Sequence, residues 1–179
     1  MTKVVTLVGL SGTGKSTVAR LLAERWGWAC ADVDSRVEIE AGRTIAEIFA
    51  NDGEAAFRAL ESAQLKTVLS EERMVVAAGG GAPCQDSAMD EILAAGPCVW
   101  LSASMDVIAG RVIESEERPL LGTVDVARIV AHLTGQLKER ESVYTRAPYC
   151  VRTDTLDPLA VVEAIESELQ ASGEGPWAP

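Results

Sequence analysis

The segment GLSGTGKS at residues 9–16 limits what this chain can fold into more than any other part of its sequence. It matches the phosphate-binding pattern G-x-x-x-x-G-K-[ST] at every position. The apolar run before it, residues 4–8, is typical of a buried parallel strand, and apolar side chains recur at helical spacing over residues 18–26. A strand, a glycine-rich loop and a helix in this order predict an α/β protein that binds a nucleoside triphosphate.

The residue types in this phosphate loop suit the phosphates of a nucleotide. Gly9, Gly12 and Gly14 allow backbone conformations in which successive N–H groups converge on phosphate oxygens. Lys15 would add a positive charge at the β- and γ-phosphates, and the Ser16 hydroxyl would bind Mg²⁺. The helix that follows would point its positive N-terminal end at the same anion. A glycine-rich turn without a ligand is the alternative, and the matching strand and helix disfavour it.

Length and charge restrict the classes of function further. A chain of 179 residues is expected to form one domain over residues 1–179. The net charge of −11 disfavours a nucleic-acid surface, which needs clustered Lys and Arg. No apolar stretch reaches the roughly 18 residues of a membrane span, and the first strand begins without a preceding signal segment. We therefore expect a cytoplasmic protein without a nucleic-acid or membrane partner.

The four cysteines are widely separated and form no C-x-x-C pair. They are Cys30, Cys84, Cys98 and Cys150. This spacing favours free, buried thiols over a zinc site.

Short apolar strands alternate with helical patterns along the chain. The alternation predicts a parallel sheet covered by helices on both faces. The five expected strands lie at Lys3–Gly9, around Cys30 and Ala31, at Met74–Ala78, at Cys98–Leu101 and around Tyr149–Arg152. Because ligands of such sheets gather at the carboxyl ends of the strands, functional residues should follow each strand.

Two segments do not fit this alternation. The polar segment Glu114–Asp125 contains Pro119 and Gly122 and separates two helical patterns, so we expect a mobile loop over about residues 114–125. A helix is expected over Leu159–Leu169, and residues 171–179 after it should form a flexible tail.

Two carboxylates, Asp32 and Asp34, follow the second expected strand. In an extended segment both would face the same side, toward the phosphate loop. One could then serve Mg²⁺ while the other orients an attacking hydroxyl and takes its proton. Alternatively, Asp34 caps the helix that is expected to begin after it. The sequence alone leaves both interpretations open.

An acid–base pair and a glycine triplet are further candidates for ligand contacts. Arg58 and Glu61 are three residues apart on an expected helix, so they can pair on one face and orient the guanidinium. An ordinary surface ion pair is the alternative.

Gly79, Gly80 and Gly81 end the third strand, where bare backbone allows a ligand to approach closely. A loop without a ligand is the alternative there.

Two later arginines complete the candidates. Arg118 lies in the polar loop, whose closure could bring the charge onto a transferred phosphoryl group. Arg140 lies on the helix expected over Val126–Tyr144, one turn before Tyr144. A lone helical arginine is more often solvated, so this residue carries little weight by itself.

Taken in order along the chain, these motifs resemble those of the shikimate kinase family. The family pattern runs phosphate loop, D-x-D, an I-E and an I-F pair, G-E-x-x-F-R-x-x-E, G-G-G, R-P-L and R-x-x-x-Y. The corresponding residues are Gly9–Thr17, Asp32–Asp34, Ile39–Glu40 with Ile48–Phe49, Gly53–Glu61, Gly79–Gly81, Arg118–Leu120 and Arg140–Tyr144. The resemblance covers about residues 3–170.

The resemblance implies an enzyme, an ATP-dependent kinase that phosphorylates the 3-hydroxyl of shikimate on the way to chorismate and aromatic amino acids. It implies the fold of nucleoside monophosphate kinases, a five-stranded parallel sheet flanked by helices. A helical substrate-binding region would span about residues 33–61, and a mobile lid about residues 114–125. The resemblance also implies Mg²⁺ as cofactor, ATP and shikimate as small-molecule partners, and a monomer.

The resemblance assigns a role to each group of candidate residues. Catalysis would depend on Lys15, Asp34 and Arg118. ATP would contact Gly12, Thr13, Gly14, Lys15, Ser16, Thr17, Arg111 and Arg118, with Arg111 packed on the adenine. Shikimate would contact Asp34, Arg58, Gly79, Gly80, Gly81 and Arg140, with the two arginines Arg58 and Arg140 on its carboxylate. Mg²⁺ would be held by Ser16 and Asp32.

One segment departs from the family pattern, and two other functions share the phosphate loop. Family members commonly carry a second adenine-side arginine before the last helix, whereas this chain reads DTLDP at residues 154–158.

A gluconate-type sugar-acid kinase has the same fold, but the glycine triplet and the F-R-x-x-E helix argue against it. A regulatory GTPase would use an N-K-x-D motif, whereas the single asparagine, Asn51, is followed by Asp52.

Overall fold

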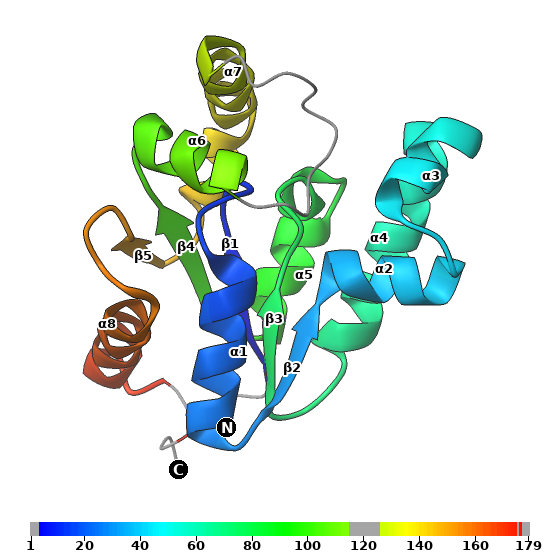
Figure 1. The fold of residues 1–179 in the computed structure, drawn as a ribbon. Coiled ribbons are helices and arrows are strands. Elements are labelled where there is room, and N and C mark those ends of the chain that lie inside the picture. Colours follow the sequence, from blue (N-terminus) through cyan, green and yellow to red (C-terminus); the bar gives the residue numbers. More distant parts are fainter. Residues whose placement is uncertain (1–3, 115–125, 175, 177–179) are drawn as a thin grey trace.

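A five-stranded parallel sheet forms the centre of the chain, with strand order β2-β3-β1-β4-β5 (Figure 1). The computed structural model describes residues 4–114, 126–174 and 176. The strands are β1 (Val4–Val8), β2 (Ala29–Asp32), β3 (Met74–Ala77), β4 (Cys98–Ser102) and β5 (Tyr149–Arg152). Each lies where the sequence predicts it, which confirms the α/β class.

Helices cover both faces of this sheet. They are α1 (Lys15–Trp26), α2 (Val33–Ala41), α3 (Ile45–Asn51), α4 (Gly53–Leu69), α5 (Ala88–Ala95), α6 (Met105–Glu114), α7 (Val126–Tyr144) and α8 (Pro158–Ala171), with a short 3₁₀ turn η1 (Ala82–Cys84). Apolar residues of α1 and α8 pack on one face of the sheet. Those of α4, α5, α6 and α7 pack on the other face. All residues of β1, the middle strand, are therefore buried.

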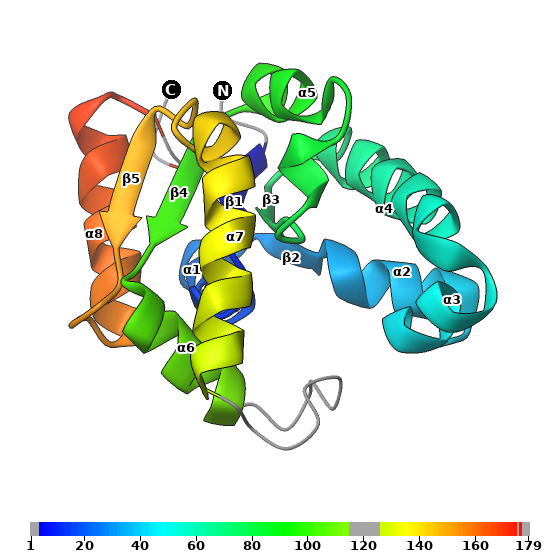
Figure 2. The same cartoon turned by 90° about the horizontal axis from the view of Figure 1, so that it is seen from above.

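Helices α2, α3 and α4 project beyond β2, to one side of the sheet (Figure 2). They enclose a small apolar cluster of their own, formed by Val37, Ile48 and Phe57. Thr44 begins α3 with a capping box, in which its hydroxyl and backbone N–H pair with Glu47. The segment expected to bind substrate, residues 33–61, is therefore helical and carries its own packing.

The parallel sheet brings five separate segments of the chain to one edge. Leu7 of β1 and Asp32 of β2 are both in register with Ala77 of β3, so these three strands end at nearly the same level. The phosphate loop follows β1, the glycine triplet follows β3, and Thr153 follows β5. This edge is where ligands of open α/β sheets bind.

Three expectations about the rest of the chain need comment. All four cysteines are free as expected, but only Cys98 among them is buried. Cys84 is half-buried, and Cys30 and Cys150 are exposed because they lie on the edge strands β2 and β5. Of the expected mobile loop, Glu114 ends α6, and the remainder with Arg118 lies outside the described residues, as do 175 and 177–179 of the expected tail. None of the described helices is long and apolar enough to cross a membrane.

Candidate active site

The phosphate loop has the backbone geometry that its glycines predict. Gly12 and Gly14 have φ angles of 84° and 92°, which side chains rarely tolerate. A Cβ atom on Gly12 would also lie 2.8 Å from Cγ2 of Val112, so the loop packs directly against α6. Gly14 caps α1, and the helix N-terminus therefore opens into the loop.

Lys15 points into the space enclosed by this loop. Its side chain is almost buried, and Nζ donates hydrogen bonds of 2.8 Å to the carbonyls of Gly9 and Leu10. The ammonium group is thus held at the N-terminal end of α1, where its positive charge adds to the positive end of the helix dipole. An anion in the loop would be attracted by both the ammonium group and the helix N-terminus.

The carboxylate of Asp32 joins the phosphate loop to the end of β2. Oδ2 accepts a hydrogen bond of 2.5 Å from the Ser16 hydroxyl, and Oδ1 accepts one of 3.1 Å from the backbone N–H of Ser35. Asp32 is therefore the N-cap of α2, and Asp34 lies in its first turn. Asp34 is therefore neither in an extended segment nor the cap of the helix, because β2 ends at Asp32, two residues before Asp34, and Asp32 itself caps α2. The two carboxylates consequently serve different parts of the site. The expected contact of Asp34 with an attacking hydroxyl stays a prediction.

Asp34 lies directly against the first glycine of the triplet. A Cβ atom on Gly79 would approach Asp34 Oδ1 to 2.5 Å and Glu61 Oε1 to 2.6 Å. Only a residue without a side chain lets the turn after β3 pass beside these two carboxylates. The glycine triplet, α2 and α4 therefore meet at one point.

Glu61 is a buried carboxylate that holds Arg58 in place. It is 2 % exposed, and its Oε2 accepts a hydrogen bond of 2.7 Å from Nη1 of Arg58. Burial raises the pKa of Glu61, while the bond to Arg58 opposes that rise. The guanidinium of Arg58 also contacts Glu54, and a Cβ atom on Gly81 would lie 2.7 Å from its Nη1. The pairing expected from the i, i+3 spacing thus orients Arg58 against the triplet.

Arg140 approaches the same triplet from the other side of the molecule. Its Nη1 lies 3.4 Å from the position of a Cβ atom on Gly80, and Tyr144, one turn later on α7, donates a hydrogen bond of 2.5 Å to the Gly80 carbonyl. The structure therefore brings Arg58 and Arg140, 82 positions apart in the chain, to neighbouring glycines. Two guanidinium groups converging on bare backbone suit a carboxylate ligand.

At the opposite end of the site, Thr153 fixes Arg111 beside the phosphate loop. Arg111 donates to Oγ1 and to the carbonyl of Thr153, over 2.9 Å and 2.6 Å. The Thr153 hydroxyl, 2 % exposed, donates in turn to the Thr13 carbonyl over 3.4 Å. Thr153 was not among the predicted site residues. Its position directly after β5, at the ligand-binding edge of the sheet, is the signal that could have identified it.

The segment that departs from the family pattern forms an apolar wall next to Arg111. Leu156 and Pro158 line the cavity there together with Val161. Asp154 faces elsewhere: its Oδ1 accepts from the Ser104 N–H over 2.8 Å, and this bond, with the nearby Arg152, lowers the pKa of Asp154 to about 2. The space beside Arg111 is suited to a flat, apolar ring.

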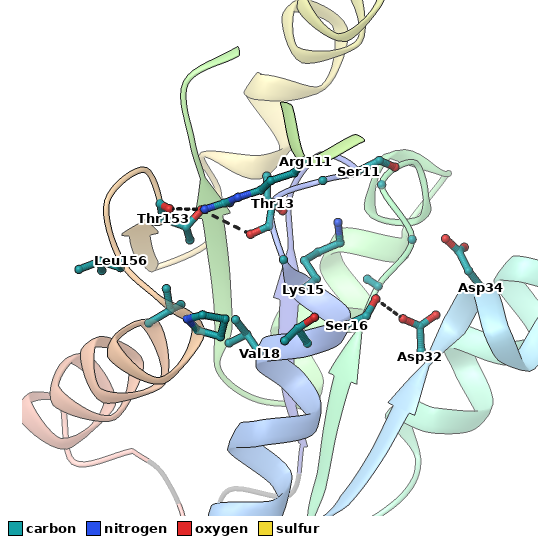
Figure 3. Close-up of a pocket in the computed structure, with 18 residues that line it drawn as sticks. Ser11, Thr13, Lys15, Ser16, Val18, Asp32, Asp34, Arg111, Thr153 and Leu156 are labelled. Carbon is teal, nitrogen blue, oxygen red and sulfur yellow. Dashed lines mark hydrogen bonds between the residues drawn. The ribbon is translucent and has the colours of Figure 1, made fainter. Parts of the chain in front are cut away.

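One cavity of about 430 Å³ connects these parts (Figure 3). Figure 3 shows Lys15 and Ser16 at its centre, with Arg111, Thr153 and Leu156 on one side and Asp32 and Asp34 on the other. The predicted site residues on its wall are Gly12, Thr13, Gly14, Lys15, Ser16, Thr17, Asp32, Asp34, Gly79, Gly80 and Arg111. Gly81 of the triplet does not line this cavity, nor do Arg58 and Arg140, which adjoin the triplet. Arg118 lies outside the described residues.

The donor set beside the phosphate loop fits a magnesium ion. Ser16 and Asp32 offer the hard oxygen ligands that Mg²⁺ prefers. Over residues 4–114, 126–174 and 176, no three His, Cys, Asp or Glu side chains gather into a metal-binding group. Such a sparse site matches the usual pattern for Mg²⁺, which takes most of its ligands from phosphates and water.

Comparisons with known proteins agree with this arrangement. A family model described as shikimate kinase matches residues 11–170 of the chain. A shikimate kinase of Chlorobium luteolum is 40% identical over 169 residues, which cover 92% of this chain and 84% of that protein. One from Thermodesulfovibrio yellowstonii is 34% identical over 173 residues, covering 97% and 98%.

Solved structures give the same picture. The structure of a shikimate kinase from Acinetobacter baumannii in complex with shikimate has a TM-score of 0.88 at 31% identity, covering 95% of this chain and 94% of that one. A shikimate kinase from Bacteroides thetaiotaomicron has a TM-score of 0.87 at 28% identity, covering 95% and 98%. The arrangement of sheet and helices is therefore the one found in these kinases.

Proposed function

The chain belongs to the shikimate kinase family, and from this premise we propose that it transfers the γ-phosphoryl group of ATP to the 3-hydroxyl of shikimate, giving shikimate 3-phosphate and ADP. The observation that carries the proposal is the single cavity that joins the phosphate loop to Asp34 and the glycine triplet. Phosphoryl transfer requires mainly that donor and acceptor are held in line and that charge is neutralised. We call the side with the phosphate loop and Arg111 the donor half of the site. The acceptor half consists of Asp34, the glycine triplet and the arginines next to it, Arg58 and Arg140.

The donor half would bind ATP from Arg111 to Lys15. The backbone of residues 12–17 receives the phosphates, and Lys15 neutralises charge on the β- and γ-phosphoryl groups. The adenine packs between the guanidinium of Arg111 and the apolar wall of Leu156 and Pro158. This wall lies where family members commonly carry the second adenine-side arginine. In this chain, packing of the adenine on Leu156 and Pro158 would replace the contact with that arginine.

Mg²⁺ would be held by Ser16 and by Asp32, directly or through water. When bound, the ion neutralises negative charge on the phosphoryl oxygens. The hydrogen bond of 2.5 Å between the Ser16 hydroxyl and Asp32 keeps both oxygens beside the phosphate loop. Asp32 is also anchored by the Ser35 N–H, so its carboxylate is positioned before any ligand arrives.

The acceptor half would bind shikimate between α2, α4, α7 and the glycine triplet. Arg58 and Arg140 hold its carboxylate from two sides, and backbone N–H groups of Gly79–Gly81 contact the ring substituents. Asp34 lies on the cavity wall between this pocket and the phosphates, where it accepts a hydrogen bond from the reacting hydroxyl and takes its proton. We further propose a monomeric enzyme of the cytoplasm, and the four free thiols fit that reducing compartment.

The acceptor is tested directly with purified protein and Mg-ATP. We expect ADP release that depends on added shikimate and that stops when EDTA removes the divalent cation. Coupled ADP measurement with shikimate, gluconate or no acceptor distinguishes the candidates. ADP release with shikimate no faster than background hydrolysis would overturn the proposal, and release with gluconate would select a sugar-acid kinase.

Thr153→Val is expected to raise the KM for ATP about tenfold while the KM for shikimate stays within twofold. The valine keeps the shape but removes the hydroxyl that joins Arg111 to the Thr13 carbonyl, and the loss of one buried hydrogen-bonding group has about this effect. Thr153→Ser should restore the parental value. Thr134→Val is the matched control, because its exposed hydroxyl donates to the Val130 carbonyl within α7. An unchanged KM for ATP would show that the Thr153 carbonyl alone positions Arg111.

A further inference from the structure

Tyr144 is a buried aromatic residue at the end of α7 whose hydroxyl reaches the glycine triplet. It is fully buried, and its ring lies 6.0 Å from that of Trp100 on β4. Its Oη donates to the Gly80 carbonyl over 2.5 Å, across 64 positions of sequence. Burial raises the pKa of Tyr144 to about 12, so the hydroxyl remains a donor at neutral pH. The same hydroxyl also interacts with the guanidinium of Arg140, one turn earlier on α7, so Tyr144 connects this arginine to the glycine triplet.

Each carbonyl of the glycine triplet accepts a hydrogen bond from the protein. The Gly79 carbonyl accepts from the Ala82 N–H over 3.1 Å, and the Gly81 carbonyl accepts from the Cys84 N–H over 3.0 Å. Both of these donors belong to the turn that immediately follows the triplet. The Gly80 carbonyl, in contrast, is held by a side chain from a distant helix.

Fixing a carbonyl also fixes the N–H of the same peptide unit. The peptide is planar and trans, so its C=O and N–H point in opposite directions. The bond to Gly79 sets the direction of the Gly80 N–H, and the bond from Tyr144 sets that of the Gly81 N–H. Because glycine has no Cβ atom, little else opposes rotation of the peptide between Gly80 and Gly81.

We propose that Tyr144 is a positioning residue for the acceptor substrate, and that its hydroxyl locks the Gly80–Gly81 peptide so that the triplet presents its N–H groups to the carboxylate-bearing ligand. The proposal rests on the function proposed above. Arg140, one turn earlier on the same helix, lies beside the same glycine. Helix α7 therefore supplies both a charged contact to the ligand and the bond that orders the backbone next to it.

Tyr144→Phe tests this role, since it removes a single oxygen and keeps the ring in the core. We expect the dissociation constant of shikimate, measured by calorimetry without nucleotide, to rise about tenfold and the KM for shikimate to rise in parallel. The affinity for ATP should stay within twofold. The amide chemical shifts of Gly80 and Gly81 should change, whereas those of Gly9 and Gly12 in the phosphate loop should not.

Tyr149→Phe is the matched control, because that hydroxyl bonds to Ser172 and Glu174 at the far side of β5. Shikimate affinity within twofold of parental in Tyr144→Phe, with or without a lower melting temperature, would overturn the positioning role. Equal weakening of ATP and shikimate would also overturn it, since it would indicate a general structural effect. If the parental protein binds shikimate but does not phosphorylate it, the proposed reaction fails and the positioning role stands. A parental protein that does not bind shikimate refutes both.

Discussion

Asp34→Asn is expected to lower kcat about 10²- to 10⁴-fold, the range that a positioned general base contributes. The amide keeps the size of the side chain and can still accept a hydrogen bond from the substrate hydroxyl, but it cannot take the proton. Asp34 lies in the first turn of α2 and on the wall of the cavity, on the side away from Arg111 and Thr153 (Figure 3). Asp34 lies beside the glycine triplet, on the acceptor side of the cavity, so the affinity for ATP should remain within about twofold.

The measurement is steady-state kinetics over a range of pH, with nucleotide binding determined separately. The Asp34→Asn variant should lose kcat at every pH of the range, while its KM for ATP stays near the parental value. Asp106→Asn is the matched control, because Asp106 also lies in the first turn of a helix but is exposed. A variant that keeps more than a tenth of the parental kcat would show that another group accepts the proton.

Much of this fold follows from the local sequence. Buried parallel strands are continuous apolar runs, so β1, β3 and β4 could be located to within a residue or two. The glycines of the phosphate loop are needed for positive φ angles, which makes that turn recognisable without knowledge of its surroundings. The pairing of Arg58 with Glu61 could also be predicted from the local sequence. Residues three positions apart on a helix lie on the same face, so helical geometry alone brings the two side chains together.

Other parts of the site depend on contacts that no local pattern encodes. The separation of Asp32 from Asp34 follows from where β2 ends, which is set by its pairing with β3. Thr153 bonds to Thr13 across 140 positions, and the role of Tyr144 depends on a glycine far away in the sequence. The motif order indicated that Asp32, Asp34 and the glycine triplet belong to one site, but it did not include Thr153, and only the sheet topology brings these segments into contact.

The closeness of Gly79 to two carboxylates makes it the glycine whose replacement should affect catalysis most. Gly79→Ala leaves the backbone free of a φ restriction, because Gly79 is not among the residues with positive φ. Its Cβ atom would nevertheless meet Asp34 Oδ1 at 2.5 Å and Glu61 Oε1 at 2.6 Å. Both oxygens end side chains that can move, so the protein should fold. The short side chain of Asp34 cannot yield without leaving its position, and Glu61 is held by Arg58.

We therefore expect Gly79→Ala to lower kcat/KM for shikimate about 100-fold, since a displacement of about 1 Å in a reacting group has that effect. ATP affinity should be unchanged, and overpacking should lower the free energy of unfolding by about 1–3 kcal/mol. Gly135→Ala is the matched control: it lies on α7 with nothing within 4 Å of a new Cβ atom, so it should stabilise the fold by about 0.5–1 kcal/mol and leave kcat/KM unchanged. Parental activity in Gly79→Ala would mean that Asp34 can act from a second position, and the close fit between the triplet and α2 would then have no catalytic role.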